Sequence, residues 1–260
     1  MAVETVAVIL TSLLGLGSGL GILVNQTVEG AIRQQVPRIE ELAVRVDTSP
    51  NYQILQGRID RVRLASRGVY FFPFLRVDIL ELETDRVNIN LANNQVRLVE
   101  PLQAVVKVIV KEEDINRALG AEQIRSLFQS IKADFSSFNP SLGVEEIDVT
   151  NPQIFFLSDQ RIRLTANLSP RKKEIKPLDI TADLAIEVLP NGNIKLSRVD
   201  LYIEGMRIPD ILINTLVRGA NRLLDLSQLE AQGIRARVLK FDITQGQMQF
   251  IGFAQLDRLP

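Results

Sequence analysis

Two groups of closely spaced carboxylates are the residues of this sequence best suited to chemistry. Glu81, Glu83 and Asp85 recur at every second position, and residues 145–148 hold a second acidic group. Paired carboxylates can hold Ca²⁺ or Mg²⁺, or can act as general acid and base. Both groups alternate with apolar residues, however, and such alternation is typical of the solvent-facing side of a strand. We therefore interpret them as solvated surface, and predict no catalytic residue and no metal site.

Composition removes most catalytic machinery, because the 260 residues include no His, no Cys and no Trp. Without His there is no imidazole base, no Ser-His-Asp relay and no His-ligated metal. Without Cys there is no thiolate nucleophile, disulfide or zinc–thiolate site, and carboxylate-only catalysis is the remaining enzymatic alternative. The net charge of −1 provides no basic field for nucleic acid. We predict a protein that is not an enzyme, has no cofactor and binds no nucleic acid.

A loop predicted between strands 161–168 and 178–188 is rich in basic side chains. Its cations are Arg171, Lys172, Lys173 and Lys176. A basic side chain near an anionic bilayer contributes about 1 kcal/mol of attraction. The loop is thus a candidate for contact with lipid head groups, and an ordinary solvated loop is the alternative interpretation.

The most unusual local sequence is the aromatic segment YFFPFL at residues 70–75, which holds three of the 11 Phe and one of the 3 Tyr. If buried, the segment would plug the core before a strand. If exposed, it would form an apolar lip suited to a membrane surface or an acyl chain. We predict that it lines the mouth or wall of a lipid cleft, with Phe71, Phe72, Pro73, Phe74 and Leu75 as the contact residues.

The N-terminal segment Thr5–Val24 is uncharged and apolar. As a helix, 20 such residues reach about 30 Å, the thickness of a bilayer's hydrocarbon core. We expect residues 1–24 to be a membrane anchor; a cleaved signal peptide and a helix buried in its own domain are the alternatives. A signal peptide is disfavoured because the leader has no basic residue and no Ala-x-Ala site follows. Gly-x-x-x-Gly spacings that permit helix–helix association occur at Gly15 and Gly19 and at Gly17 and Gly21.

Beyond the anchor, the hydrophobic period predicts first a helix and then strands. Residues 25–41 have helical spacing and are predicted to form an amphipathic stalk interrupted at Pro37. From Leu42 the period changes to 2, which indicates antiparallel strands with one buried face. The alternating segments are residues 42–47, 75–83, 87–91, 161–168, 178–188, 194–203, 235–243 and 247–254. Phase slips at residues 79–80 and 197–198 indicate β-bulges.

Two further helices are predicted at residues 112–131 and 209–226, where apolar residues follow a 3.6-residue period. The fold class that follows is α+β: a long, curved antiparallel sheet packed on amphipathic helices and preceded by an N-terminal apolar helix. The predicted domains are the anchor at residues 1–24, the stalk at residues 25–41 and one domain at residues 42–260.

Three motifs resemble the bacterial LmeA-type phospholipid-binding family, and most closely its uncharacterised cyanobacterial branch. They are the run ILQGRIDRVRLA at residues 54–65, FPFL at residues 72–75, and PLQAVVKVIVKEEDINRAL at residues 101–119. The resemblance covers roughly residues 28 to 190. It implies an elongated fold similar to tubular lipid-binding domains, with phospholipid against aliphatic walls and no catalytic residues. The family motif carries over to Phe72, Pro73, Phe74 and Leu75; unlike actinobacterial relatives, the N-terminus lacks a basic export signal.

The function we expect is non-enzymatic phospholipid binding at a membrane, in lipid transfer or envelope maintenance. The alternative is a structural or scaffolding membrane protein with a closed core and no ligand. We expect attachment to a bacterial inner or thylakoid membrane. The two indications of sidedness disagree. Arg33 and Arg38 follow the apolar segment and favour a cytoplasmic domain by the positive-inside tendency, whereas the family resemblance favours an extracytoplasmic one, toward which we lean.

Overall fold

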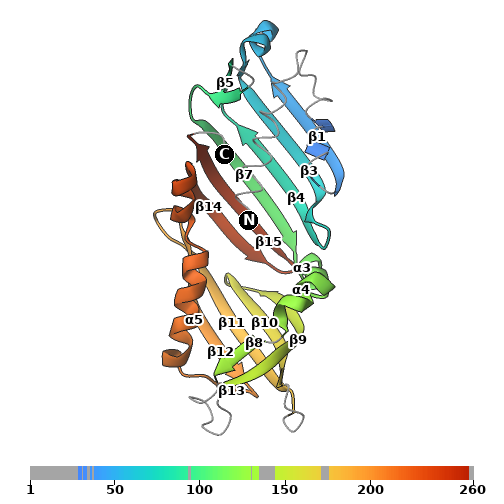
Figure 1. Ribbon diagram of the computed structural model, residues 1–260, viewed down its shortest axis with the longest axis vertical. Coiled ribbons are helices and arrows are strands. Elements are labelled where there is room, and N and C mark those ends of the chain that lie inside the picture. The colour runs from blue at the N-terminus through green and yellow to red at the C-terminus, as the bar shows by residue number, and fades with distance from the viewer. Residues whose placement is uncertain are drawn as a thin grey trace.

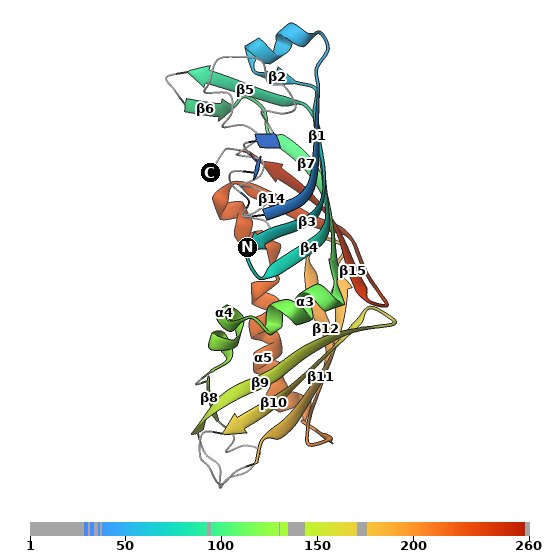
Figure 2. The same cartoon turned by 90° about the vertical axis from the view of Figure 1, so that its right-hand side faces the viewer.

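The protein is elongated, and its two large antiparallel sheets lie end to end along the long axis (Figure 1). The computed structural model describes residues 29, 30, 32, 33, 36, 38–92, 95–129, 131–134, 144–170 and 176–257. Both sheets curve toward the same side, and α3, α4 and α5 lie on that side (Figure 2). We call this side the inner face.

Sheet I has six strands in the order β1-β3-β4-β7-β15-β14. Its strands are β1 (Arg38–Asp47), β3 (Arg61–Phe72), β4 (Leu75–Thr84), β7 (Leu102–Lys111), β14 (Ile234–Thr244) and β15 (Gln247–Leu256). A small three-stranded sheet adjoins it, formed by β2 (Arg58–Ile59), β5 (Val87–Ala92) and β6 (Gln95–Leu98). The last two strands of the chain thus complete a sheet that its first strands begin.

Sheet II has six strands in the order β13-β12-β11-β10-β9-β8. Its strands are β8 (Ile131–Asp134), β9 (Val144–Leu157), β10 (Arg161–Pro170), β11 (Leu178–Val188), β12 (Ile194–Ile203) and β13 (Met206–Arg207). Each strand pairs with its neighbour in sequence, so sheet II is a meander inserted between β7 and β14.

The helices are short and connect the sheets. They are α3 (Glu112–Leu119), α4 (Glu122–Arg125), α5 (Asp210–Leu223) and the 3₁₀ segments η2 (Asn51–Gln56), η3 (Ser126–Phe128) and η4 (Leu226–Gln232). In Figure 1, α5 runs along one side of sheet II, and α3 and α4 lie on the other side.

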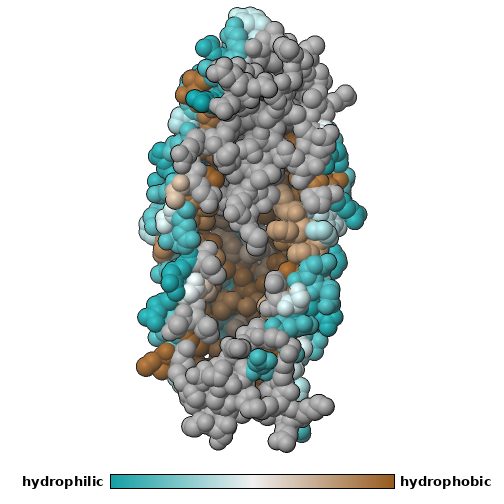
Figure 3. Space-filling model, in the orientation of Figure 1, coloured by the Kyte–Doolittle hydropathy of each residue, from teal (hydrophilic) through white to brown (hydrophobic). Residues whose placement is uncertain are grey.

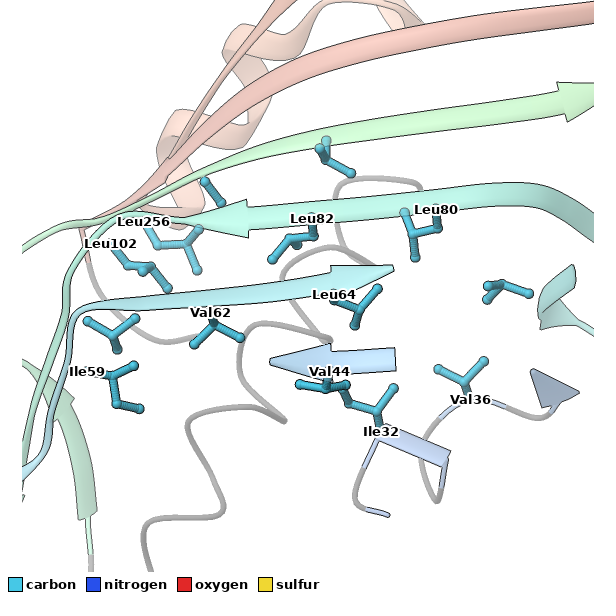
Figure 4. Packing of buried hydrophobic residues seen from close by; sticks show 14 of the residues in the cluster. Ile32, Val36, Val44, Ile59, Val62, Leu64, Leu80, Leu82, Leu102 and Leu256 are labelled. Carbon is cyan, nitrogen blue, oxygen red and sulfur yellow. The ribbon is translucent and has the colours of Figure 1, made fainter. Parts of the chain in front are cut away.

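A closed aliphatic core covers the inner face of sheet I. Alternation along each strand sends every second side chain inward, where the side chains from β3, β4, β7 and β15 meet (Figure 4). Ile32 and Val36 are also buried in this core, packed from the segment that precedes β1. The small sheet adds Ile59, Val87 and Ile89. Sheet I is therefore the packed half of the molecule.

Hydrogen bonds between side chains and backbone join the two sheets at their junction. The Asn116 side chain on α3 donates to the Ile154 carbonyl at 2.8 Å and accepts from the Ile154 N–H at 2.7 Å. The β11–β12 turn docks on β14, where the Val238 N–H donates to the Gly192 carbonyl at 2.7 Å. Gly192 has a φ of +83°, and a Cβ there would lie 2.7 Å from the Cβ of Arg237, so this contact requires glycine.

The strand predictions are largely confirmed, including the turn after β11 and the bulge in β12, where the register shifts opposite Ala185 and Ile186. The fold class needs correction: the described chain is mainly β, with two six-stranded sheets and few short helices. The predicted helix 112–131 is wrong in length, because α3 ends at Leu119 and Ala121 is extended before α4. Strand β1 begins at Arg38, within the predicted stalk. The predicted anchor lies outside the described residues.

Candidate functional site

The inner face of sheet II is aliphatic and only partly covered. Hydrogen-bonded partners across the strands form a row of side chains on this face, made of Ile154, Leu164, Ala182 and Leu201. Leu164 is 38% exposed, and the three others are half-buried. Leu82, an equivalent inward leucine of sheet I, is 2% exposed. The row therefore leaves apolar surface available that the core of sheet I does not.

The row lies between two packed clusters of apolar side chains. Toward sheet I, Phe156 and Ile162 pack with Ile243 in a buried cluster at the junction. Toward the other end of the molecule, Ile203 packs with Ile213 of α5. The row lies between these clusters, and the small side chain of Ala182 deepens the floor between two leucines.

The space-filling view shows a hollow on the same face (Figure 3). Its floor is hydrophobic, and hydrophilic residues line both long margins. Because α5 and α3 lie on opposite sides of this face (Figure 1), they form walls around the floor. Apolar floors with polar margins are typical of sites for small amphipathic ligands, whose burial contributes about 25 cal/mol for each Å² of apolar surface.

The predicted aromatic segment forms the turn between β3 and β4. Phe71 is half-buried and packs against the core of sheet I. Phe72 and Phe74 stack with ring centroids 5.6 Å apart, and Phe72 is 36% exposed. Pro73 is exposed at the turn, and Leu75 is half-buried at the start of β4. The segment is thus partly core and partly exposed lip, at the same edge of sheet I as α3 (Figure 1).

A charged network holds α3 against this edge of sheet I. Arg76 donates to Glu40 at 2.9 Å, to Asp78 at 2.8 Å and to the buried Asp114 of α3 at 3.1 Å. The hydrogen bond from Arg76 lowers the pKa of Glu40. Burial alone would raise the pKa of Asp78, but the hydrogen bond from Arg76 and the charge of Lys111 outweigh it and lower this pKa. The network keeps these carboxylates ionised and fixes one wall of the hollow.

The other sequence-based candidates lie away from the hollow. Glu81 pairs with Lys107 at 3.2 Å and Glu83 pairs with Arg61 at 3.1 Å, both on the outer face of sheet I. Across the part of the chain that the structure describes, no three His, Cys, Asp or Glu residues are grouped to hold a metal. Of the predicted basic loop, Lys176 is exposed, and Arg171, Lys172 and Lys173 lie outside the described residues.

A second depression, of about 510 Å³, lies on the outer face of sheet I. Its floor includes Ala43 and Ala65, and ion-paired side chains such as Lys107 and Glu81 surround it. This depression is shallow and its rim is charged, unlike the apolar hollow on the inner face.

Comparison with known families adds an independent observation. A family model described as LmeA-like phospholipid-binding matches residues 15–253. The chain belongs to this family. The match spans both sheets, so the open face of sheet II is part of the family domain. The predicted resemblance is confirmed at the level of the LmeA-like family, and the match does not distinguish a cyanobacterial branch. No curated protein and no solved structure matches the chain.

Membership of a phospholipid-binding family indicates phospholipid binding and membrane association. Within the described residues, no helix is long and apolar enough to cross a bilayer. The predicted anchor Thr5–Val24 and its glycines Gly15, Gly17, Gly19 and Gly21 are outside that part of the chain.

The sequence analysis did not identify the row on the inner face of sheet II as a binding surface. The alternation of residues 161–168 and 178–188 predicted strands, but the predicted contact residues were those of the aromatic segment. A usable signal was present, because Ala182 interrupts an otherwise large aliphatic series from Leu178 to Val188. A small side chain among large ones on one face of a strand indicates a local depression in that face of the sheet.

Proposed function

We propose that this member of the LmeA-like family is a membrane-associated, non-enzymatic protein that holds phospholipid acyl chains against the inner face of sheet II. The observation that carries the proposal is the partly open aliphatic row that contains the exposed Leu164 and the half-buried Ala182, on the inner face of sheet II. The space-filling view shows a hydrophobic hollow on the same face of the molecule (Figure 3). A solvent-exposed floor of this kind is unfavourable unless an apolar ligand covers it. Family membership supports phospholipid as that ligand.

Residues outside the row are candidate partners for other parts of the lipid. The lip formed by the exposed Phe72 and Pro73 and the half-buried Phe74 suits contact with acyl chains, with Phe71 and Leu75 anchoring the lip to sheet I. Lys176 suits a head-group phosphate, together with Arg171, Lys172 and Lys173 of the same loop sequence.

The proposed cellular role is lipid transfer or envelope maintenance at a bacterial inner or thylakoid membrane, with the domain extracytoplasmic. Attachment through residues 5–24 follows from their length and hydropathy. The Gly-x-x-x-Gly spacings at Gly15 and Gly19, and at Gly17 and Gly21, suit association of two such helices.

A charge placed on the floor tests the binding role. In Leu164→Glu, a carboxylate would meet acyl chains, and we expect phospholipid occupancy of the purified full-length protein to fall about tenfold. Native mass spectrometry after gentle detergent removal measures the occupancy. Leu239→Glu is the matched control, because Leu239 is 56% exposed on β14 and is not among the side chains that line the row.

Equal occupancy in Leu164→Glu and Leu239→Glu would contradict this site. A wild-type protein that holds no phospholipid would contradict the binding role altogether, and would favour the scaffolding alternative. The closed core of sheet I is the part of the molecule that such a scaffold would use.

A further inference from the structure

The end of the molecule formed by β13 and the start of α5 carries two strongly exposed apolar side chains. Ile211 is 79% exposed, which is the highest value among the large hydrophobic residues that the structure describes. Met206 is 57% exposed. Both lie at the lower end of sheet II in Figure 1, where β13 pairs with β12 and α5 begins.

The backbone around these two side chains is fixed, so the side chains cannot turn into the core. Ile208 is buried between them, and its N–H donates to the Leu201 carbonyl at 2.7 Å. Arg207 pairs with Asp210 at 2.8 Å, which joins β13 to the first residue of α5. On α5, Ile213 is buried and Ile211 lies two residues earlier, on the opposite side of the helix. The fold therefore holds Met206 and Ile211 toward solvent.

Four charged side chains beside this apolar pair are ion-paired: Arg198, Asp200, Arg207 and Asp210. Arg207 also pairs with Asp200 at 2.9 Å, and Arg198 pairs with the same carboxylate at 2.8 Å. Moving an unpaired charge toward a low-dielectric phase is expensive, whereas hydrogen-bonded pairs reduce that cost. The end containing Met206 and Ile211 can therefore approach a lipid surface without burying any of these ion-paired side chains as an isolated charge.

A line of apolar side chains on one face of sheet II joins this end to the row. Met206 pairs with Ile203, and Ile203 pairs with Ile180, so their side chains lie on that face. Ile203 is itself buried against Ile213 of α5, and Ile180, which is half-buried, neighbours Ala182 on β11. At the opposite end of the molecule Tyr52 and Val99 are exposed, but they adjoin sheet I and the small sheet rather than the inner face of sheet II.

We propose that the end containing Met206 and Ile211 inserts into the surface of a phospholipid bilayer, and that lipid enters the hollow from this end. The proposal rests on the lipid-binding function proposed above, and it adds the surface through which the lipid is exchanged. Burying these side chains among head groups and upper acyl chains supplies the affinity.

Site-specific fluorescence tests the docking, since the chain has no Cys and a single introduced Cys can be labelled uniquely. Full-length Ile211→Cys and the control Val99→Cys, which is 57% exposed in the wild type, are labelled with an environment-sensitive dye. Each is reconstituted into phosphatidylcholine–phosphatidylglycerol vesicles with and without doxyl-labelled lipid. We expect at least about twofold stronger quenching at position 211 than at position 99. Equal quenching at the two positions, or none at 211, would overturn the docking surface.

A second measurement separates this proposal from the lipid-binding function. Met206→Glu with Ile211→Glu should lower the rate of lipid uptake from vesicles about tenfold, because two apolar contacts are lost. Occupancy after loading from detergent-solubilised lipid should be unchanged. If the wild type never holds lipid while position 211 is quenched, the binding function fails and the docking stands. If lipid is held and the double variant takes it up at the wild-type rate, the docking alone fails.

Self-association through the same apolar pair is the competing explanation. It would appear as a label signal at position 211 that rises with protein concentration in lipid-free detergent, and that outcome would also overturn the bilayer assignment. We expect a concentration-independent signal there.

Discussion

Leu82 and Leu164 are the same residue type at equivalent inward positions, yet the first is closed off and the second is 38% exposed. The difference lies in what covers each residue. Leu82 belongs to a core to which β1, the segment before it and the small sheet all contribute. Leu164 belongs to the row on the inner face of sheet II, and α3 and α5 lie on opposite sides of that sheet (Figure 1). At the level of single residues, coverage by other elements decides which side chains serve the fold and which can meet a ligand.

The aromatic turn gives a prediction in which neighbouring residues respond differently. Phe72→Ser combined with Phe74→Ser should lower the urea-unfolding free energy by less than about 1–2 kcal/mol, because Phe72 is exposed, Phe74 is only half-buried, and neither ring packs in the core cluster of sheet I. Vesicle binding should weaken, since an apolar lip is lost. Phe71→Ser, the matched control, should lower the unfolding free energy by about 2–4 kcal/mol because Phe71 packs against the core. Equal destabilisation by both changes would show that the lip belongs to the core.

Arg76 is the residue on which the charged network depends, because it contacts Glu40, Asp78 and Asp114 at once. Arg76→Gln should lower the unfolding free energy at pH 7 by about 2–4 kcal/mol, since it leaves the buried Asp114 with one fewer cation. Urea denaturation measures the loss. Arg45→Gln, which removes an exposed partner of Asp47 on β1, is the control and should cost under about 1 kcal/mol.

The same network predicts the direction of acid sensitivity. Folding lowers the pKa of Glu40 and of Asp78, so each carboxylate contributes stability that is fully present above its unfolded pKa. That contribution is lost as the pH falls through the lowered pKa values, on the acidic side of the ordinary pKa of each carboxyl group. The unfolding free energy of the wild type should therefore fall in this acidic range. Arg76→Gln should show a shallower fall, and an unchanged slope would contradict the assignment.

At the level of elements, α3 joins the two sheets because one of its side chains forms hydrogen bonds with the backbone of β9. The Asn116 amide forms both hydrogen bonds that a neighbouring strand would offer Ile154. Asn116→Leu should cost about 2–4 kcal/mol of unfolding free energy, because a backbone N–H and a carbonyl at a half-buried position lose their partners. Hydrogen exchange at the Ile154 amide should accelerate. Gln123→Leu on the exposed side of α4 is the control, and a similar effect from both would exclude this specific role.

Many strand positions were predictable from sequence because alternation is a local property, but β3, β7 and β9 were not among the predicted segments. The pairing of distant strands was not: β7 pairs with β15 so that Leu102 faces Leu256, and no local pattern links residues so far apart. The division into two sheets depends on such distant contacts. The end of α3 at Leu119 is local, because Gly120 follows it and caps the helix. The aromatic motif was visible in the sequence, but the open row around Leu164 was not. Its exposure follows from where α3 and α5 lie, rather than from β10 itself.

At the scale of the whole molecule, the half built on sheet I has a closed core, and the half built on sheet II has a partly open inner face. Sheet I buries its inner face under chain segments from both termini, and this rigid half can hold sheet II in place. The junction formed by Phe156, Ile162 and Ile243 continues the apolar surface from one half to the other. A ligand in the hollow therefore rests on a scaffold whose stability does not require the ligand to be present.

This division predicts where the chain can be shortened. Removing residues 1–24 should yield a folded protein that is no longer retained in carbonate-washed membranes, because among the described residues the first one buried in the core is Ile32. Removing residues 1–36 also deletes Ile32 and Val36, whose burial is worth about 1.5–3 kcal/mol each. That longer deletion should lower the unfolding free energy by about 3–6 kcal/mol.

Carbonate extraction and thermal unfolding of the two truncations, beside the full-length chain, measure the two effects separately. A 1–24 deletion that stays membrane-bound would move the anchor elsewhere in the chain, and one that unfolds would make residues 5–24 part of the domain core.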